Sequence, residues 1–215
     1  MLPRGAIAAG LALGLVFAVS STAAARPQPA AGQVDAVEQG ASPTVQRLKS
    51  WVLGTDDNQG LPFVIIDKVN AHVFVYRHDG HLLGATPVLL GLARGDIAPP
   101  GIGDRPLSTI TPDERITPSG RFVASLGRNL TEGSVLWIDY DGALSLHPVV
   151  RGRPVDRRQE RLASPTSDDN RISYGCVNVP IPFYQEVIAT TFRGTVGIVY
   201  ITPERLPIAE VFPGV

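Results

Sequence analysis

The sequence is poor in cysteine and has no excess of positive charge. Cys176 is the one cysteine among 215 residues, so no internal disulfide can form and stability has to come from packing. The 19 Lys and Arg residues are balanced by 20 Asp and Glu residues, which gives a formal net charge of −1. Because there is no basic bias and no polybasic run, neither nucleic acid nor an acidic lipid surface is predicted as a partner.

The residue clusters that are typical of metal centres are also missing. Three of the four histidines, His72, His78 and His81, surround one predicted hairpin, whereas His147 stands apart from them. Together with Cys176 they lack the ligand spacing of a closed zinc site. The sequence contains no glycine-rich phosphate loop of recognised spacing, so we expect neither a metal nor an organic cofactor.

One long apolar run is present, at the N-terminus. Arg4 precedes an apolar stretch from Gly5 to Ser20, and Ala23-Ala24-Ala25 offers a cleavage site of the A-x-A type. The stretch is shorter than the roughly 20 residues of a spanning helix, so residues 1–25 are interpreted as a signal peptide. An uncut anchor is the alternative. Both predict export to the periplasm or the cell-wall space, and cleavage would leave no stable membrane insertion.

Composition predicts one domain after the signal. Residues 26–41 are rich in Ala, Pro, Gln and Gly and are interpreted as a flexible linker. The roughly 190 residues that remain after cleavage are enough for one domain with a proper core. We expect this domain over residues 42–205, with its core over 62–202 and a C-terminal tail at 206–215.

Most of the predicted elements are strands. Ser42-Pro43 predicts the start of a helix that Gly54 would end, and the Asp79-Gly80 and Asp141-Gly142 pairs predict hairpin turns. Runs rich in β-branched residues predict strands at 63–67, 72–76, 81–92, 120–124, 135–140, 143–147 and 197–201. A helix is predicted at 180–192, and irregular loops are predicted at 95–118 and 151–171.

Cys176 is the main candidate for chemistry. An unpaired thiol in an exported protein needs a reason other than a disulfide, and Gly175 before it allows a tight turn. Such a turn can aim backbone N–H groups at a developing oxyanion while a nearby base, His147, activates the thiol. The alternatives are a buried structural cysteine and a half-buried histidine that is satisfied by a backbone carbonyl.

Two segments resemble the L,D-transpeptidase catalytic (YkuD) domain family. That family carries a histidine, a spacer and a Ser/Thr-His-Gly-Cys-x-Asn/Arg segment, which His147 and Ser173-Tyr174-Gly175-Cys176-Val177-Asn178 match. Thr117-Pro118-Ser119-Gly120-Arg121-Phe122 resembles the family's upstream Thr-Pro-x-Gly-x-Phe segment. The resemblance covers residues 62–202. It implies a mainly β fold, an L,D-transpeptidase-like mixed β-sandwich with a few short helices.

The resemblance also implies acyl transfer on peptidoglycan stem peptides. Cys176 would attack the carbonyl that joins the L-centre of a diamino acid to a terminal D-alanine, forming a thioester. His147 would take the thiol proton, and a backbone carbonyl near Ser173 could orient it. Backbone N–H groups near Tyr174, Gly175 and Cys176 would hold the oxyanion.

Two further polar residues are weaker candidates for substrate binding. Asn178 is expected to brace the turn, and Arg121 could hold a substrate carboxylate. The spacer between His147 and Ser173 is longer than usual for the family, and it is either a solvated charged loop or a basic lid over an anionic peptide. Its arginines are Arg151, Arg153, Arg157, Arg158 and Arg161.

The sequence also departs from the family pattern in ways that keep other functions open. Tyr174 stands where the family usually has histidine, and Pro148 follows His147 where a small residue is common. A hydrolase on the same scaffold, such as an L,D-carboxypeptidase, is one alternative to the transpeptidase. A wall-binding module that has lost activity is another.

Overall fold

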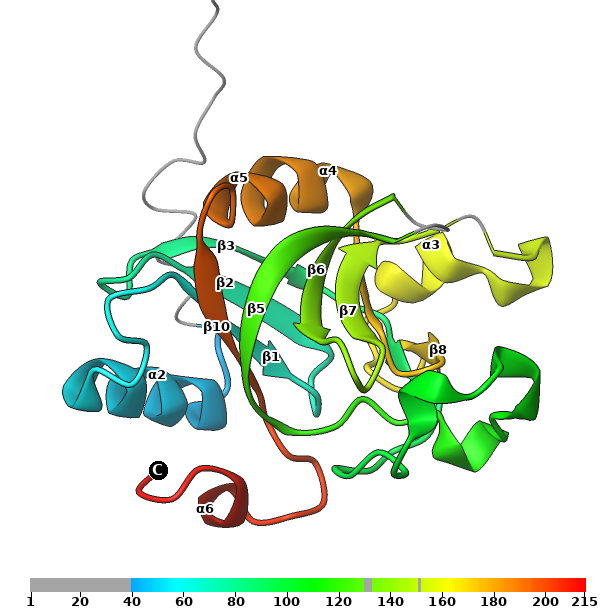
Figure 1. The fold of residues 1–215 in the computed structure, drawn as a ribbon, viewed down its shortest axis with the longest axis horizontal. Helices are drawn as coiled ribbons and strands as arrows, with labels where there is room; N and C mark the ends of the chain where they lie inside the picture. Colours follow the sequence, from blue (N-terminus) through cyan, green and yellow to red (C-terminus); the bar gives the residue numbers. More distant parts are fainter. Residues whose placement is uncertain (1–39, 130–132, 151) are drawn as a thin grey trace, which may run out of the picture.

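The computed structural model describes residues 40–129, 133–150 and 152–215 (Figure 1). The predicted signal peptide and residues 26–39 of the predicted linker lie outside the described residues. The described chain is mainly β, with one large mixed sheet and a few short helices, which confirms the predicted fold class. None of the helices in these ranges is long and apolar enough to cross a membrane.

The large sheet has eight strands in the order β3-β2-β1-β10-β5-β6-β7-β9. Its strands are β1 Phe63–Asp67, β2 His72–Tyr76, β3 Leu82–Pro87, β5 Gly120–Asn129, β6 Gly133–Asp139, β7 Leu144–Pro148, β9 Val177–Val179 and β10 Val196–Ile201. A second, two-stranded sheet pairs β4 Leu90–Gly91 with β8 Arg171–Ser173. The two layers expected of a sandwich are thus the two halves of one sheet. These halves meet at β10 and β5 and line a common core.

Strands β1 and β2 form where the sequence predicts them. They pair antiparallel across the turn at Asn70, from Phe63 opposite Tyr76 to Asp67 opposite His72. Both faces of this hairpin are buried, which explains the nearly continuous apolar runs. Alternate residues therefore enter two different hydrophobic clusters on the two faces of the sheet.

Helices cover both of these clusters. One is covered by a continuous helical segment, α4 Ile181–Phe183, η5 Tyr184–Ile188 and α5 Ala189–Thr191, which confirms the helix predicted at 180–192. The other is covered by α2, Pro43–Thr55, and by α6, Ile208–Val211 (Figure 1).

The ends of these helices differ in part from the prediction. Ser42 caps α2 as predicted, its Oγ accepting a hydrogen bond from the Val45 N–H at 3.3 Å. The helix runs past Gly54 to Thr55, because Asp56 takes the left-handed conformation that ends it. The predicted C-terminal tail contains α6 and buries Phe212, which is 2% exposed.

The strand predicted at 81–92 is broken after Pro87. β3 pairs with β2 up to Pro87, which has no N–H to continue the ladder. Two residues further on, Leu89 and Asn178 exchange backbone hydrogen bonds of 2.8 and 2.9 Å, so the β3 and β9 ends of the sheet come together at this point. The break therefore carries the chain to the strand that follows Cys176.

The predicted loop at 95–118 is irregular, as expected, with short helical turns. These turns are η1 Ile102–Asp104, η2 Leu107–Thr109 and η3 Pro112–Glu114. The insertion at 151–171 is more ordered than predicted, because it forms η4 Pro154–Asp156 and α3 Arg158–Leu162 before β8.

Strands β7 and β9 are parallel neighbours at one edge of the sheet, and the insertion is the connection between them. Leu146 lies opposite Val177 in this pairing, and both side chains enter the core. Because side chains alternate along a strand, Ser145, His147 and Asn178 occupy the other face.

Candidate functional site

A glycine turn presents Cys176. Gly175 has φ +132°, and a Cβ built there would lie 2.8 Å from the Ile116 carbonyl oxygen, so only glycine fits. The Ser173 hydroxyl closes the turn, donating to the Cys176 carbonyl at 2.6 Å and accepting from the Gly175 N–H at 3.1 Å. Ser173 therefore holds the turn together, and the Gly175 N–H is engaged within it.

The Cys176 sulfur is half-buried and has polar neighbours. Sγ lies 3.4 Å from the Ala143 carbonyl oxygen and 3.5 Å from the Ser145 hydroxyl. It opens on a pocket of about 110 Å³ between the turn and the 95–118 loop. Ser145 was not predicted as part of the site, although its position two residues before His147 on one strand is a signal that could have found it.

The His147 imidazole is buried and hydrogen-bonded at both nitrogens. Nδ1 lies 2.9 Å from the Pro148 carbonyl oxygen, and Nε2 lies 3.0 Å from Nδ2 of Asn178. His147 pairs with Asn178 across β7 and β9, so its ring lies next to the strand that continues directly from Cys176. The carbonyl that orients the ring is that of Pro148, which replaces the predicted carbonyl near Ser173.

Arg158, from the insertion, extends this arrangement. Its Nη1 donates to Oδ1 of Asn178 at 2.8 Å. We call the series Arg158, Asn178, His147 and the Pro148 carbonyl the His147 chain. Asn178 was predicted to brace the turn, and the structure shows it bridging the histidine and an arginine 20 residues away in the sequence.

Thr117 supports the turn from the 95–118 loop. Its hydroxyl donates to the Gly175 carbonyl at 2.7 Å and accepts from the Gly91 N–H at 2.8 Å. The Thr117 carbonyl in turn accepts from Nζ of Lys68 at 2.9 Å. Thr117 belongs to the Thr-Pro-x-Gly segment quoted above, but its contact with the turn that presents Cys176 could not be read from the sequence.

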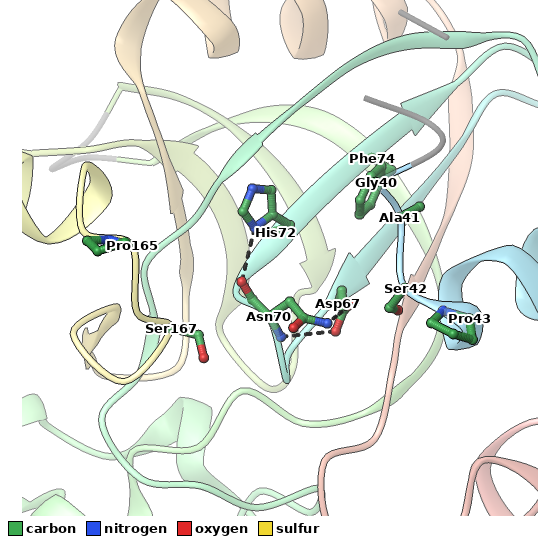
Figure 2. Close-up of a pocket in the computed structure, with 10 residues that line it drawn as sticks. All are labelled: Gly40, Ala41, Ser42, Pro43, Asp67, Asn70, His72, Phe74, Pro165 and Ser167. Atoms are coloured by element: carbon green, nitrogen blue, oxygen red, sulfur yellow. Dashed lines mark hydrogen bonds between the residues drawn. The ribbon is translucent and has the colours of Figure 1, made fainter. Parts of the chain in front are cut away.

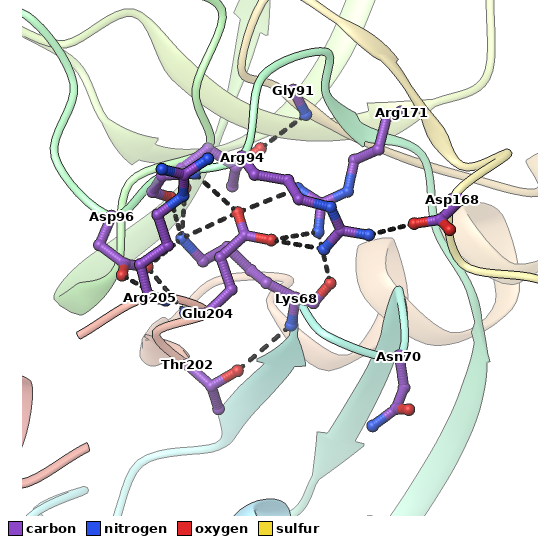
Figure 3. Close-up of polar contacts among 12 residues, drawn as sticks. Lys68, Asn70, Gly91, Arg94, Asp96, Asp168, Arg171, Thr202, Glu204 and Arg205 are labelled. Carbon is purple, nitrogen blue, oxygen red and sulfur yellow. Dashed lines mark hydrogen bonds and ion pairs between the residues drawn. The ribbon is translucent and has the colours of Figure 1, made fainter. Parts of the chain in front are cut away.

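Lys68 is the centre of a buried group of charges (Figure 3). Its Nζ lies 2.7 Å from Oδ1 of Asp96 and 3.8 Å from Glu204, and Glu204 also pairs with Arg171 at 2.7 Å. We call Lys68, Asp96, Arg171 and Glu204 the Lys68 cluster. Burial lowers the pKa of Lys68, against the opposing effect of the Asp96 hydrogen bond. The cluster binds Gly95 at one end of the 95–118 loop and Thr117 at the other.

Arg121 lies away from this site. Its Nε pairs with Oδ2 of Asp57 at 2.6 Å, and Asp57 also accepts from the Tyr200 hydroxyl. The pairing keeps Arg121 beside the end of α2, and it is not among the residues that line the Cys176 pocket. The structure therefore does not bring this predicted substrate contact to Cys176.

Tyr174 lies at the rim of the Cys176 pocket. Its ring is partly exposed, and the Arg115 guanidinium lies over it at 4.0 Å from the centroid. In the position where the family usually has histidine, the chain thus has an aromatic ring held by a cation.

The arginines of the insertion mostly bind protein groups. Arg158 reaches Asn178, and Arg161 donates to the backbone carbonyls of Asp156 and Asp169, each at 2.8 Å. Arg151 lies outside the described residues. For Arg158 and Arg161, neither alternative, a solvated charged loop or a basic lid, describes these contacts, which fold the insertion onto the domain.

A larger pocket lies elsewhere in the molecule. It has a volume of about 770 Å³ and is lined by residues that include Ser42, Asp67, His72 and Ser167 (Figure 2). Asp67 accepts hydrogen bonds from Asn70 there, so the polar groups at its base satisfy one another. Over residues 40–129, 133–150 and 152–215, no three His, Cys, Asp or Glu side chains are grouped so as to hold a metal ion.

Comparisons with known proteins give the following similarities. No family model matches the chain, and no curated protein sequence matches it. A solved L,D-transpeptidase mutant from Enterococcus faecium is 19% identical, with 65% of this chain and 49% of that chain covered and a TM-score of 0.39. The isolated catalytic domain of the E. faecium L,D-transpeptidase is 19% identical, with 66% and 97% covered and a TM-score of 0.39.

A third similar structure is the helical cell shape determining protein from Campylobacter jejuni. It is 14% identical, with 68% of this chain and 48% of that chain covered and a TM-score of 0.44. The chain spans about half the length of the first solved structures that it matches.

Proposed function

We propose that the protein is an exported cysteine acyltransferase that acts on peptidoglycan stem peptides by L,D-transpeptidation. Cys176 is the nucleophile and His147 is the base. The observation that carries this proposal is the pairing of β7 with β9, which sets His147 opposite Asn178, two residues beyond Cys176. The Ser145 hydroxyl, from the same face of β7 as His147, lies 3.5 Å from the sulfur, and the sulfur opens on a pocket.

The first step of the proposed reaction is attack by the thiol. The Cys176 proton passes to the His147 imidazole as the sulfur bonds to the carbonyl carbon between the L-centre of the diamino acid and D-alanine, a step in which Nε2 gives up the hydrogen bond that it receives from Nδ2 of Asn178. The Pro148 carbonyl, 2.9 Å from Nδ1, keeps the ring oriented and stabilises the imidazolium that forms.

The turn suggests which backbone group holds the oxyanion. Thr117 fixes the Gly175 carbonyl, and in a planar trans peptide the N–H of the next residue points the opposite way. The Cys176 N–H is therefore directed away from Thr117, whereas the Gly175 N–H is already bonded to Ser173. This favours the Cys176 N–H over that of Gly175 as the oxyanion donor.

The second half of the reaction releases the acyl group. The C–N bond breaks, the imidazolium gives its proton to the leaving amine of D-alanine, and a thioester remains on Cys176. An acceptor amine then attacks the thioester, loses its proton to His147 and forms the cross-link, and the thiolate is reprotonated. Water in place of the amine gives the carboxypeptidase reaction. Export rests on the N-terminal sequence, which lies outside the described residues.

The test of this proposal is incubation with purified tetrapeptide stem, followed by mass spectrometry of the intact protein. We expect an adduct on the wild type of the mass of the acyl group, absent in Cys176→Ala, together with free D-alanine and a cross-linked product. Free D-alanine without a cross-linked product would show that the protein hydrolyses the stem peptide instead of cross-linking it. No adduct and no D-alanine would refute acyl transfer on this substrate.

A second measurement separates an enzyme from an inactive wall-binding module. The rate of Cys176 alkylation by iodoacetamide across pH reports the apparent pKa of the thiol. An enzyme requires a thiol that reacts well below the pH at which a free cysteine does, whereas an inert thiol would support the binding module.

A further inference from the structure

Ser145 is a buried polar residue between two leucines of the core. Leu144 and Leu146 flank it on β7 and enter the hydrophobic core, whereas Ser145 lies on the other face of the strand and is 2% exposed. We infer that Ser145 is a further catalytic residue, whose hydroxyl donates a hydrogen bond to the Cys176 sulfur and stabilises the thiolate. The inference rests on the proposed role of Cys176 as nucleophile. It concerns how the thiolate is stabilised and not which group takes the proton.

The pairing of β7 with β9 brings Ser145 to the sulfur. Leu146 lies opposite Val177, so the residues one position earlier in each segment, Ser145 and Cys176, are neighbours across the parallel pair. Because side chains alternate along a strand, both lie on the face opposite the core residues Leu146 and Val177. Ser145 Oγ lies 3.5 Å from Sγ. The contact therefore follows from the strand register and not from the conformation of a surface loop.

The sulfur is the hydrogen-bond partner of the Ser145 hydroxyl. Within residues 40–129, 133–150 and 152–215, this hydroxyl has no second partner. Burying a hydroxyl costs free energy unless it forms a hydrogen bond. Strand β7 is already paired on both sides, with β6 and β9, so the sheet does not need the hydroxyl to be complete. The contact with Cys176 is therefore what accounts for a polar side chain at this buried position.

The direction of the two hydrogen bonds at the sulfur follows from the atoms that take part. The Ala143 carbonyl oxygen, 3.4 Å from Sγ, only accepts, so the thiol donates its one proton there. If Ser145 accepted from the thiol instead, its own hydroxyl proton would be buried without an acceptor. Both protons are used only when the thiol donates to Ala143 and the Ser145 hydroxyl donates to the sulfur.

Ionisation of Cys176 changes these two contacts in opposite ways. Loss of the thiol proton removes the bond to Ala143 and leaves the carbonyl oxygen beside a negative charge, which disfavours the thiolate. The Ser145 hydroxyl keeps its proton and then donates to an ionised acceptor. Hydrogen bonds of that kind are shorter and roughly twice as strong as neutral ones. Ser145 therefore favours the thiolate and opposes the effect of the Ala143 carbonyl.

Other ionisable groups surround the sulfur and its pocket, and all of them remain when Ser145 is replaced. They are His147 on β7, Asp139 on β6, Tyr174 in the turn, Arg105 and Arg115 in the 95–118 loop, and Arg158 of α3, which reaches Asn178. Arg105 is already paired with Glu114 at 2.7 Å. A difference between variants at position 145 therefore reports on the hydroxyl.

The test is the rate of Cys176 alkylation by iodoacetamide between about pH 5 and pH 10, which gives an apparent pKa and a plateau rate for the thiolate. In Ser145→Ala the apparent pKa should rise by about one pH unit, because a charge-assisted hydrogen bond is lost. The plateau rate should rise by about threefold, because a more basic thiolate is more nucleophilic. Ser134→Ala is the matched control. It removes a strand hydroxyl that lies 3.2 Å from the Tyr184 hydroxyl and does not line the pocket, and it should titrate like the wild type.

A second pair of variants holds the shape of the side chain constant. Ser145→Thr keeps the hydroxyl, Ser145→Val puts a methyl group in its place, and both residues suit a strand. The apparent pKa of Cys176 should be about one pH unit lower in the threonine variant than in the valine variant. Any effect of the added methyl group is common to the two proteins. This pair replaces Ser145→Ala if that protein does not fold.

Three results would each overturn the inference. They are an apparent pKa in Ser145→Ala equal to or below that of the wild type, equal values in the threonine and valine variants, and a rate in Ser145→Ala that falls equally at every pH. The last would show that the hydroxyl only holds the sulfur in place. None of these measurements uses stem peptide. A protein that forms no thioester with stem peptide can still show the pKa difference, and an active acyltransferase can lack it.

Discussion

Two polar networks reach the turn that presents Cys176, and they are built from different groups. The Lys68 cluster consists of buried charges that compensate one another, and it touches the turn through Thr117 (Figure 3). The His147 chain has one cation at its outer end and continues through a neutral amide, an imidazole and a carbonyl. Removing one member of the first leaves an uncompensated charge, whereas removing one member of the second breaks a hydrogen bond that orients the His147 ring. The first should therefore govern stability, and the second should govern reactivity.

The largest effect is expected from Lys68→Met. This change leaves the buried Asp96 carboxylate without its cation, whereas Glu204 keeps Arg171, and breaking a buried ion pair typically costs about 3–5 kcal/mol. The free energy of unfolding, measured with urea, should fall by that amount. Arg77→Gln removes a cation whose side chain is 53% exposed and paired with Asp79, and should leave the urea midpoint unchanged. A Lys68→Met protein as stable as the wild type would contradict the expectation that the Lys68 cluster, unlike the His147 chain, governs stability.

Acid should weaken the Lys68 cluster by a smaller amount. Burial alone raises the pKa of Asp96, but hydrogen bonds from Lys68 and from three backbone N–H groups outweigh it and lower the pKa overall. The stability that Asp96 contributes is therefore present above the unfolded value of about 4 and is lost as the pH falls through the folded pKa. Urea midpoints between pH 7 and pH 3 should show this decline, and Asp96→Asn should flatten it. A decline of equal slope in both proteins would contradict the assignment.

Thr117→Val tests the point at which the Lys68 cluster meets the turn that presents Cys176. Valine keeps the shape but loses the hydroxyl that joins the Gly91 N–H to the Gly175 carbonyl. Of these two hydrogen bonds, the one to the Gly175 carbonyl acts on the turn; a neutral hydrogen bond is worth roughly 1 kcal/mol, so Cys176 alkylation should slow by about fivefold. Thr117→Ser retains the hydroxyl and should react like the wild type. Equal rates for the valine and serine variants would show that the bond does not position the turn.

The smallest effect is expected from Tyr174→Ala, outside both networks. The ring lies at the pocket rim against Arg115, so its loss should raise KM for the stem peptide about twofold to threefold and leave kcat unchanged. Tyr140→Ala is the matched control, because Tyr140 is 75% exposed and does not line the pocket. A fall in kcat instead would place the Tyr174 ring in the chemistry, beside the His147 chain.

The fold could be predicted wherever local signals agreed. Residues 63–67 and 72–76 form strands with the predicted bounds, because each is a five-residue apolar run bounded by turn residues. The run at 81–92 carries equally good strand residues, but its second part pairs with β8, far along the chain. Pairing between residues that are far apart in the chain leaves no signal in the nearby sequence apart from Pro87.

The site could be predicted in part, for a physical reason. Cys176 and Gly175 are neighbours in sequence, so the positive φ of the glycine and the presentation of the thiol follow from a short motif. The contacts of Arg158 and Lys68 span 20 and 49 residues, to Asn178 and Thr117, and depend on the tertiary fold. A lysine is also the side chain least expected to be fully buried, so composition argued against Lys68 as an organising residue.

The parallel course of β7 and β9 has a consequence for how such sites vary. Two strands that run in the same direction cannot be joined by a tight turn, so the chain must travel back along the sheet between them. Closing a longer excursion costs only slowly more entropy, so this return path can lengthen or shorten while both strand ends keep their places. The number of residues that separate His147 from Cys176 is thus a free variable of the architecture. A sequence pattern written with a fixed gap would pass over chains in which the two strands lie in the same arrangement.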